Sequence, residues 1–188
     1  MDLEAAVIAL QGYETLRIPG LLQTEAYVRA LLNAHHPPLD DETIELRVAA
    51  RLERQHMLTA RPTTYFGFGF GFGFGFVFGE IALRCPVGGP EMMREQCERL
   101  LELGASRNVD IEVMPTSQGA HAGINGPTVL LESPDHQHYA YEEGQSMSVL
   151  HADSETVSKL TQRFGVIRMQ ALNAEESARL IREVADQW

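Results

Sequence analysis

Glycine and phenylalanine alternate along residues 66–79, and Val77 is the one interruption. Successive side chains of an extended strand point to opposite faces, so the alternation places every aromatic ring on one face and every glycine on the other. A glycine in a strand costs roughly 0.5–1 kcal/mol relative to alanine, so packed rings and neighbouring strands must supply the stability. The repeat predicts a one-sided strand that depends on its neighbours.

The register of such a strand is poorly specified, because a shift by two residues reproduces the same pattern. Exposed copies of the repeat would favour pairing with a second molecule. One interpretation is a self-assembling or aromatic-binding surface, and the alternative is a repeat expansion inside an ordinary strand or hairpin. The candidates for self-association are Phe68, Phe70, Phe72 and Phe74.

The chain before the repeat carries the signals of helices. Thr24 is a suitable N-cap, because its hydroxyl can accept from an amide that lacks a partner in the first turn. Apolar residues at three- and four-residue spacing predict a longer helix after Asp40 or Asp41. We therefore expect an all-helical section over residues 1–60, with helices at residues 3–10, 25–33 and 41–58.

The chain after the start of the repeat has the signals of a sheet. Strand, helix and strand follow one another over residues 76–114, which is the order of a parallel crossover unit. Asp153 or Ser154 and then Asn173 can cap two closing helices. Three further strands are expected at residues 128–132, 138–142 and 146–151.

These elements predict an α/β (mixed α+β) fold in a single domain over residues 1–188. The helical section of residues 1–60 would precede a mixed sheet with packed helices over residues 61–188.

The formal net charge of -11 argues against direct contact with nucleic acid, whose phosphates need clustered Lys and Arg. A local basic patch could form from Arg47, Arg51 and Arg54, which have near-helical spacing. Glu45 and Glu53 are interleaved with them, so we interpret this stretch as a solvated helix face.

Cysteine usage and hydropathy suggest a cytoplasmic protein. Cys85 and Cys97 lack the spacing of a metal site or of a disulfide-rich domain. The N-terminus is acidic and lacks a secretory signal, and no apolar stretch reaches the ~20 residues that span a bilayer. We expect no membrane association.

Known catalytic motifs and metal-ligand spacings are missing from the sequence. His35-His36 and the pair His136 and His138 lack a third ligand at fixed spacing, so solvated loop histidines are the simpler interpretation. The Gly-x-Gly matches in the repeat lack the strand-then-helix context of a phosphate-binding loop. We expect no enzyme activity, no catalytic residues, no metal and no cofactor.

Two groups of residues are candidates for contact with a ligand or partner. Glu80 and Arg84 lie four apart at the end of a predicted strand, where function is often found, although an ordinary ion pair explains them as well. The second group lies around the start of the second helix, where capping and packing are the alternative. It consists of Gln23, Glu25 and Tyr27.

Six ordered blocks of this sequence resemble the C-terminal domain of WhiJ-like regulators, which are actinobacterial XRE-type helix-turn-helix transcription regulators. The first is IPGLLQTEAYVRALL and the third is EIALRCPVGGPEMMREQ. The blocks lie at residues 18–32, 47–55, 80–96, 108–115, 121–135 and 172–185. Between Pro62 and Glu80 the chain is longer than the family pattern by about the length of the repeat.

The resemblance implies a regulatory domain of transcription in development or secondary metabolism. The helix-turn-helix module that normally precedes this domain is absent from this sequence, so DNA would be contacted only through that module. The resemblance also implies a small BldB-like protein as a partner, with an effector as the other possibility. We further expect that the domain could form a homodimer.

His121 is a further candidate for contact with a ligand or partner, and it also supports one catalytic alternative. The order of elements around it is distantly phospholipase-D-like, and that chemistry needs a lysine two residues after the histidine. Gly123 stands at that position, so the cation that would stabilise phosphate is missing. The alternatives to a regulatory domain are thus a degenerate phosphodiesterase-like hydrolase and a self-assembling module built on the Gly-Phe strand.

Overall fold

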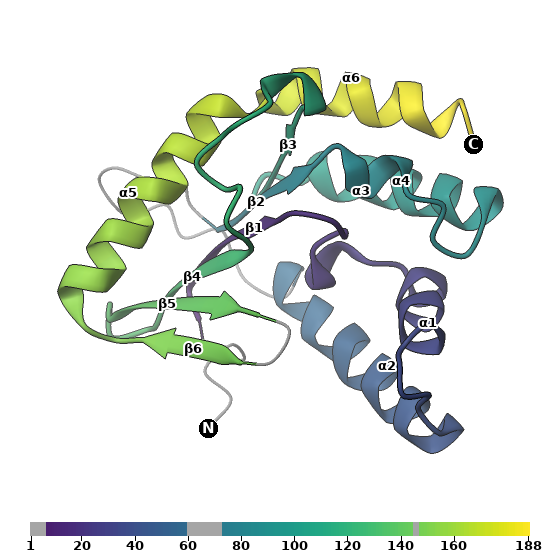
Figure 1. The fold of residues 1–188 in the computed structure, drawn as a ribbon, viewed down its shortest axis with the longest axis horizontal. Coiled ribbons are helices and arrows are strands. Elements are labelled where there is room, and N and C mark those ends of the chain that lie inside the picture. The colour runs from purple at the N-terminus through teal and green to yellow at the C-terminus, as the bar shows by residue number, and fades with distance from the viewer. Residues whose placement is uncertain (1–6, 60–72, 145–146) are drawn as a thin grey trace.

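The structure is a computed structural model that describes residues 7–59, 73–144 and 147–188. One mixed six-stranded sheet carries helices on both faces, which confirms the expected mixed α/β fold (Figure 1). The strands are β1 (Ala9–Glu14), β2 (Phe74–Gly79), β3 (Val109–Met114), β4 (Thr128–Glu132), β5 (His138–Glu143) and β6 (Ser148–His151). The α-helices are α1 (Glu25–Asn33), α2 (Asp41–Gln55), α3 (Ile81–Arg84), α4 (Pro90–Gly104), α5 (Ser154–Gln170) and α6 (Ala174–Ala185). Short 3-10 turns are η2 (Gly20–Leu22), η3 (His56–Leu58) and η4 (Thr116–Gln118).

The strand order is β3-β2-β1-β4-β5-β6. β1, β2 and β3 run parallel to one another, and the remaining pairs are antiparallel. The predicted crossover unit is confirmed, since α3 and α4 connect β2 to the parallel strand β3. Figure 1 shows α5 on one side of the sheet and α1 to α4 on the other, with α6 near β3.

β1 corrects the prediction of an all-helical section over residues 1–60. It is a strand in the interior of the sheet and pairs with β2 on one side and β4 on the other. Both partners come from distant parts of the chain, so their hydrogen bonds leave no signal in the local sequence. Leu10 packs on one face and Tyr13 on the other, which is the period of a strand.

The described part of the Gly-Phe repeat forms β2. Phe74, Phe76 and Phe78 point to one face and are all buried there, as the alternation predicts. The strand is not one-sided, however, because Val77 is buried in a second cluster beneath α5. Of the self-association candidates, Phe74 is a core residue, and the other three lie outside the described residues.

The end of β2 fixes its register. A Cβ at Gly79 would lie 2.5 Å from the Thr15 carbonyl oxygen, so only glycine fits there. A shift of the strand by two residues toward its carboxyl end would place Val77 at that position. The alternating part of the repeat is ambiguous, and Val77 and Gly79 at its carboxyl end remove the ambiguity.

The predicted helix caps are confirmed. Thr24, Asp40 and Asp153 accept hydrogen bonds from the amides of Tyr27, Thr43 and Thr156. Asn173 and Glu176 form a full capping box at the start of α6. In the described part of the chain, no helix is both long and apolar enough to cross a membrane.

Candidate functional site

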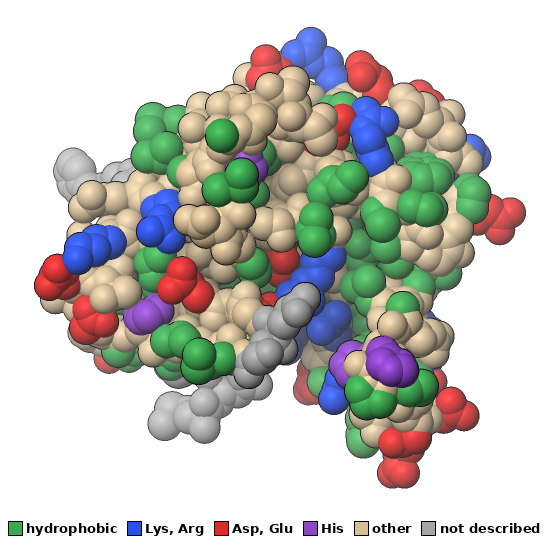
Figure 2. All heavy atoms as spheres, in the orientation of Figure 1, with side chains coloured by type: hydrophobic (Ala, Val, Ile, Leu, Met, Phe, Trp, Pro, Cys, Tyr) green, Lys and Arg blue, Asp and Glu red, His purple; other side chains and the backbone are tan. Residues whose placement is uncertain are grey.

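A pocket of about 220 Å³ opens on the Phe-bearing face of the sheet, between β1, β4 and β5 on one side and η2 and α2 on the other. Figure 2 shows Lys and Arg side chains gathered in the hollow between the β5–β6 hairpin and α2. We call this site the arginine pocket. Its polar lining residues are Glu14, Arg17, Gln23, Arg51, Arg54, Tyr141 and Glu143, and its apolar and glycine lining is Leu10, Gly12, Pro19, Gly20, Leu21, Phe76 and Val129.

Gly12 provides the open floor of the arginine pocket. It lies on β1 between Phe76 of β2 and Val129 of β4. A Cβ at Gly12 would be 3.7 Å from Phe76 Cδ1 and 4.0 Å from Val129 Cγ2, which are ordinary contacts. A small side chain would fit there, so the glycine leaves space that a larger side chain would occupy.

Arg17 holds the mouth of the pocket together. Its guanidinium lies 3.2 Å from Glu14 Oε1 and 2.5 Å from Glu143 Oε2, so it links the loop after β1 to the end of β5. Burial raises the pKa of Glu14, although the neighbouring Arg17 partly offsets this effect. Burial also opposes the charge of Arg17, but the two glutamates raise its pKa above the ordinary value.

Arg51 presents a different environment on the opposite wall. Its Nη1 donates to Gln23 Oε1 at 3.0 Å, and a Cβ at Gly20 would lie 3.9 Å from its Nε. Among the described residues, no carboxylate lies within 4.0 Å of this guanidinium. Burial lowers the pKa of Arg51, and the nearby Arg17 lowers it further, while the more distant carboxylates of Glu143 and Glu14 offset only part of this effect. An added anion would relieve both effects.

Three glutamines fix the loop that carries η2. Gln23 is buried and donates from Nε2 to the Ile18 carbonyl oxygen at 2.6 Å, which turns its amide oxygen toward Arg51. Gln55 of α2 donates to the Gln23 carbonyl oxygen at 2.7 Å. Gln96 of α4 accepts from the Thr24 amide and donates to the Leu22 carbonyl oxygen, both at 2.8 Å. The wall that positions Arg51 is thus rigidly bonded to two helices.

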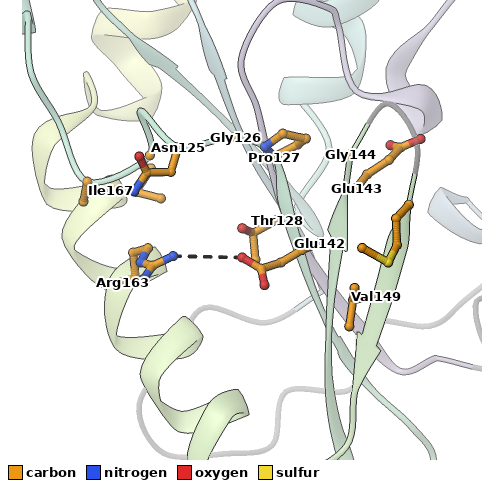
Figure 3. Close-up of a pocket in the computed structure, with 13 residues that line it drawn as sticks. Asn125, Gly126, Pro127, Thr128, Glu142, Glu143, Gly144, Val149, Arg163 and Ile167 are labelled. Atoms are coloured by element: carbon orange, nitrogen blue, oxygen red, sulfur yellow. Dashed lines mark ion pairs between the residues drawn. The ribbon is translucent and has the colours of Figure 1, made fainter.

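A second pocket, of about 230 Å³, lies on the α5 face of the sheet (Figure 3). Arg163 of α5 points across it toward Glu142 of β5, with 4.0 Å between guanidinium nitrogen and carboxylate oxygen. Glu142 also lies 3.1 Å from His151 Nε2. Glu143 lines both pockets, so the end of β5 separates the two sites.

Residues 1–183 match the family described as Domain of unknown function (DUF5753). The chain belongs to this family. No curated protein and no solved structure matches the chain. The phospholipase-D-like part of the fold prediction therefore stays a prediction. Both pockets of this DUF5753 domain lie entirely within the matched residues.

The second group of predicted contact residues, around the start of α1, has mainly structural surroundings in the DUF5753 domain. Tyr27 is fully buried, and its hydroxyl accepts from the Ile18 amide at 3.3 Å. Glu25 is exposed and pairs with Arg29 at 2.8 Å. Gln23 alone reaches a pocket, where it holds Arg51. These contacts favour the capping and packing interpretation for Tyr27 and Glu25.

Glu80 and Arg84 form an ion pair at 2.8 Å. Glu80 Oε2 also accepts from the amide and the hydroxyl of Thr116, each at 2.9 Å. Although burial opposes ionisation, these hydrogen bonds and Arg84 lower the pKa of Glu80. The arrangement ties the end of β2 to the loop after β3, which favours the ion-pair alternative.

His121 lies beside the second pocket and stacks edge-on against Tyr13, with 6.0 Å between ring centroids. Its Nδ1 accepts from the Gly123 amide at 3.2 Å. A Cβ at Gly123 would lie 2.4 Å from Tyr13 Cε1, so the Tyr13 ring occupies the space that a lysine would need. In the described part of the chain, no group of three or more His, Cys, Asp or Glu side chains could hold a metal ion.

Of the residues that line the arginine pocket, only Gln23 was predicted as a contact residue, and the cations Arg17, Arg51 and Arg54 were not. Arg51 was interpreted as part of a solvated helix face, whereas the structure places it half-buried against Gly20 and Gln23. The available signal was the Pro19-Gly20 pair, which follows the segment that forms β1 after four residues. Recognising that segment as an interior strand would have placed Arg17 and Arg51 over the sheet.

Proposed function

We propose that this DUF5753 domain is a regulatory domain that binds a small molecule in the arginine pocket. The observation that carries the proposal is Arg51, a half-buried cation that Gln23 holds at the wall of a pocket. No carboxylate of the described residues lies within 4.0 Å of it, although Glu143 and Glu14 act on it from farther away. Buried charges in proteins are normally paired, so the site is completed by an anion from outside.

The composition of the pocket supports binding rather than catalysis. Among its described lining residues there is no Ser, Cys, His or Lys to act as a nucleophile. The two acids, Glu14 and Glu143, both lie in ion pairs with Arg17. Arginine, amide and apolar side chains are the means of fixing and orienting a ligand.

The resemblance to WhiJ-like regulators supports a role in transcription. Three of the six blocks meet at the arginine pocket. Residues 18–32 supply Pro19, Gly20, Leu21 and Gln23, residues 47–55 supply Arg51 and Arg54, and residues 121–135 supply Val129. We infer that occupancy of the pocket controls DNA binding by a helix-turn-helix module of the same regulator.

A thermal-shift screen tests the ligand-binding proposal. A library of neutral, cationic and anionic small molecules would be measured against the wild-type chain and against Gly12→Leu, whose side chain fills the pocket floor. We expect some compounds to raise the melting temperature of the wild type and not of Gly12→Leu. A library without any such compound would contradict the proposal.

A protein partner is the second candidate. The contrast between the two edges of the sheet supports it, because one edge is covered and the other is open. Val113 on the outer edge of β3 is covered, since its amide donates to Ser177 Oγ and its carbonyl accepts from the Leu172 amide, both at 2.9 Å. At the opposite edge no described strand pairs with the far side of β6. Met147, Val149 and Leu150 are exposed there. Open, apolar edges accept an extra strand.

Titration calorimetry with the BldB-like protein tests this second candidate. We expect Leu150→Lys to weaken binding, because a charged side chain on the edge discourages strand addition. Met169→Lys, which changes an exposed apolar residue of α5, is the matched control. Equal binding by both variants and the wild type would remove β6 from the interface.

A further inference from the structure

The two halves of the arginine pocket differ in chemistry. One wall carries the guanidinium of Arg51, and the floor consists of Gly12 with the side chains of Phe76 and Val129. A ligand that satisfies both halves has a charged group at one end and an apolar body at the other. We propose that the pocket binds a small organic monocarboxylate with a flat apolar body. This proposal rests on the ligand-binding function proposed above.

The hydrogen-bonding capacity of Arg51 points to the carboxylate. A guanidinium has five N–H donors, and Gln23 Oε1 receives one of them. The planar arrangement of the remaining donors matches a carboxylate in a bidentate contact. Gln23 is itself held by the Ile18 carbonyl oxygen, so the guanidinium is oriented before the ligand arrives.

The surroundings of Arg51 favour a single negative charge. Arg17, another cation of the pocket lining, is already matched by Glu14 and Glu143. A ligand with several negative charges would bring them close to these two glutamates, and like charges at short range are unfavourable. The volume of about 220 Å³ also suits a body of one or two rings rather than a nucleotide.

Glu143 competes with the ligand for the arginines. Glu143 is more exposed than Glu14, and it is the last residue of β5. Glu143 acts electrostatically on Arg51, so a ligand carboxylate bound to Arg51 would lie near a like charge. Removing the charge of Glu143 should therefore tighten the binding of a carboxylate.

Calorimetric titration of the full chain with 1-naphthoate and 1-naphthamide tests the proposal. The two probes have the same rings, and only the first is charged. We expect the wild type to bind the carboxylate at least about tenfold more tightly than the amide, as a charge-assisted contact predicts. Arg51→Gln should remove this difference, and Glu143→Gln should tighten the binding of 1-naphthoate.

Arg163→Gln is the control, because it removes one arginine from the pocket on the opposite face of the sheet. It should leave both affinities unchanged. Equal binding of carboxylate and amide by the wild type would overturn the monocarboxylate proposal, and so would the absence of binding by both. Hits from the thermal-shift screen that Gly12→Leu abolishes would still support the ligand-binding function in either case. The comparison of probes on the wild type remains decisive even if Arg51→Gln does not fold.

Discussion

Single side chains decide the electrostatics of the arginine pocket. Gln23 is a neutral amide, yet by accepting from Arg51 and donating to the Ile18 carbonyl it determines where a guanidinium stands. At the mouth of the pocket, the Glu14 carboxylate forms an ion pair with Arg17. Burial disfavours the charged form of Glu14 and raises its pKa. Each pocket wall thus depends on one polar side chain, Gln23, which is buried, or Glu14, which is largely buried.

Glu14 should make the stability of the protein depend on pH. Burial raises the pKa of Glu14 in the folded state. The protonated side chain therefore contributes to the stability of the fold below the ordinary carboxyl pKa, and this contribution is lost as pH rises through the raised pKa. Glu14→Gln should therefore increase the free energy of unfolding at neutral pH, with a gain that shrinks as pH falls. Urea unfolding between acidic and neutral pH measures this.

Glu53→Gln changes an exposed carboxylate of α2 and is the reference for that experiment. The prediction for Glu14 fails if the free energies of unfolding of Glu14→Gln and of the wild type change with pH in parallel.

Gly123 is required by the ring of Tyr13. Gly123→Ala should destabilise the fold by roughly 1–3 kcal/mol, the usual cost of forcing an extra carbon into a packed site. The reason is the 2.4 Å approach of its Cβ to Tyr13 Cε1. Gly12→Ala is the matched control, because its Cβ would meet nothing closer than 3.7 Å. Similar unfolding midpoints for the two variants would contradict this account.

At the scale of elements, a largely buried ion pair joins α5 to β3. Arg168 donates from Nε to Glu112 Oε2 at 3.0 Å, and its Nη2 also contacts this carboxylate. Arg168→Met keeps the apolar stem and leaves Glu112 buried without its cation. We expect a loss of roughly 1–3 kcal/mol in denaturant unfolding.

Lys159→Met on the same helix breaks only an exposed pair with Glu155 and serves as the comparison. A loss no greater than the one from Lys159→Met would show that the buried pair adds no stability.

The connection between η3 and β2 should tolerate shortening. Asn108 contacts the residues on both sides of this connection. Its Nδ2 donates to the Leu58 carbonyl oxygen at 2.7 Å, and its backbone carbonyl oxygen accepts from the Phe74 amide at 2.9 Å. The two flanks are therefore already close, and loop closure depends only weakly on length. Deleting residues 69–72 should change the free energy of unfolding by less than about 0.6 kcal/mol.

Light scattering of the same deletion tests the self-association prediction for the repeat. Unchanged association would remove Phe70 and Phe72 from that role, whereas a lower association would support these two residues as contact residues. A large loss of stability would instead show that the deleted residues contribute to the core.

At the scale of the whole molecule, sequence patterns predicted the elements whose partners are local. The caps at Thr24, Asp153 and Asn173 and the crossover from β2 to β3 all follow from short-range spacing. β1 was not predicted, because its hydrogen bonds go to strands far along the chain. Periodicity within a few residues contains no information about such partners.

The arginine pocket was not predicted for a related reason. Its lining comes from β1, β2, β4, β5, η2 and α2, so it exists only after the sheet has formed. Gln23 was identified as a candidate from its block, but its role as the support of Arg51 depends on a contact between residues 28 positions apart.

The way β2 is anchored also has a consequence for inheritance. Tandem repeats gain and lose copies when DNA is duplicated, and the Gly-Phe units are such a tract. β2 is formed by the carboxyl end of the tract, where Val77 and Gly79 fix the register of the strand. Copies that are added or lost before Phe74 therefore leave the sequence of β2 unchanged. Descendants with different copy numbers would keep the same core and the same Phe76 in the pocket floor, and the tract could vary in length between lineages without selection against the fold.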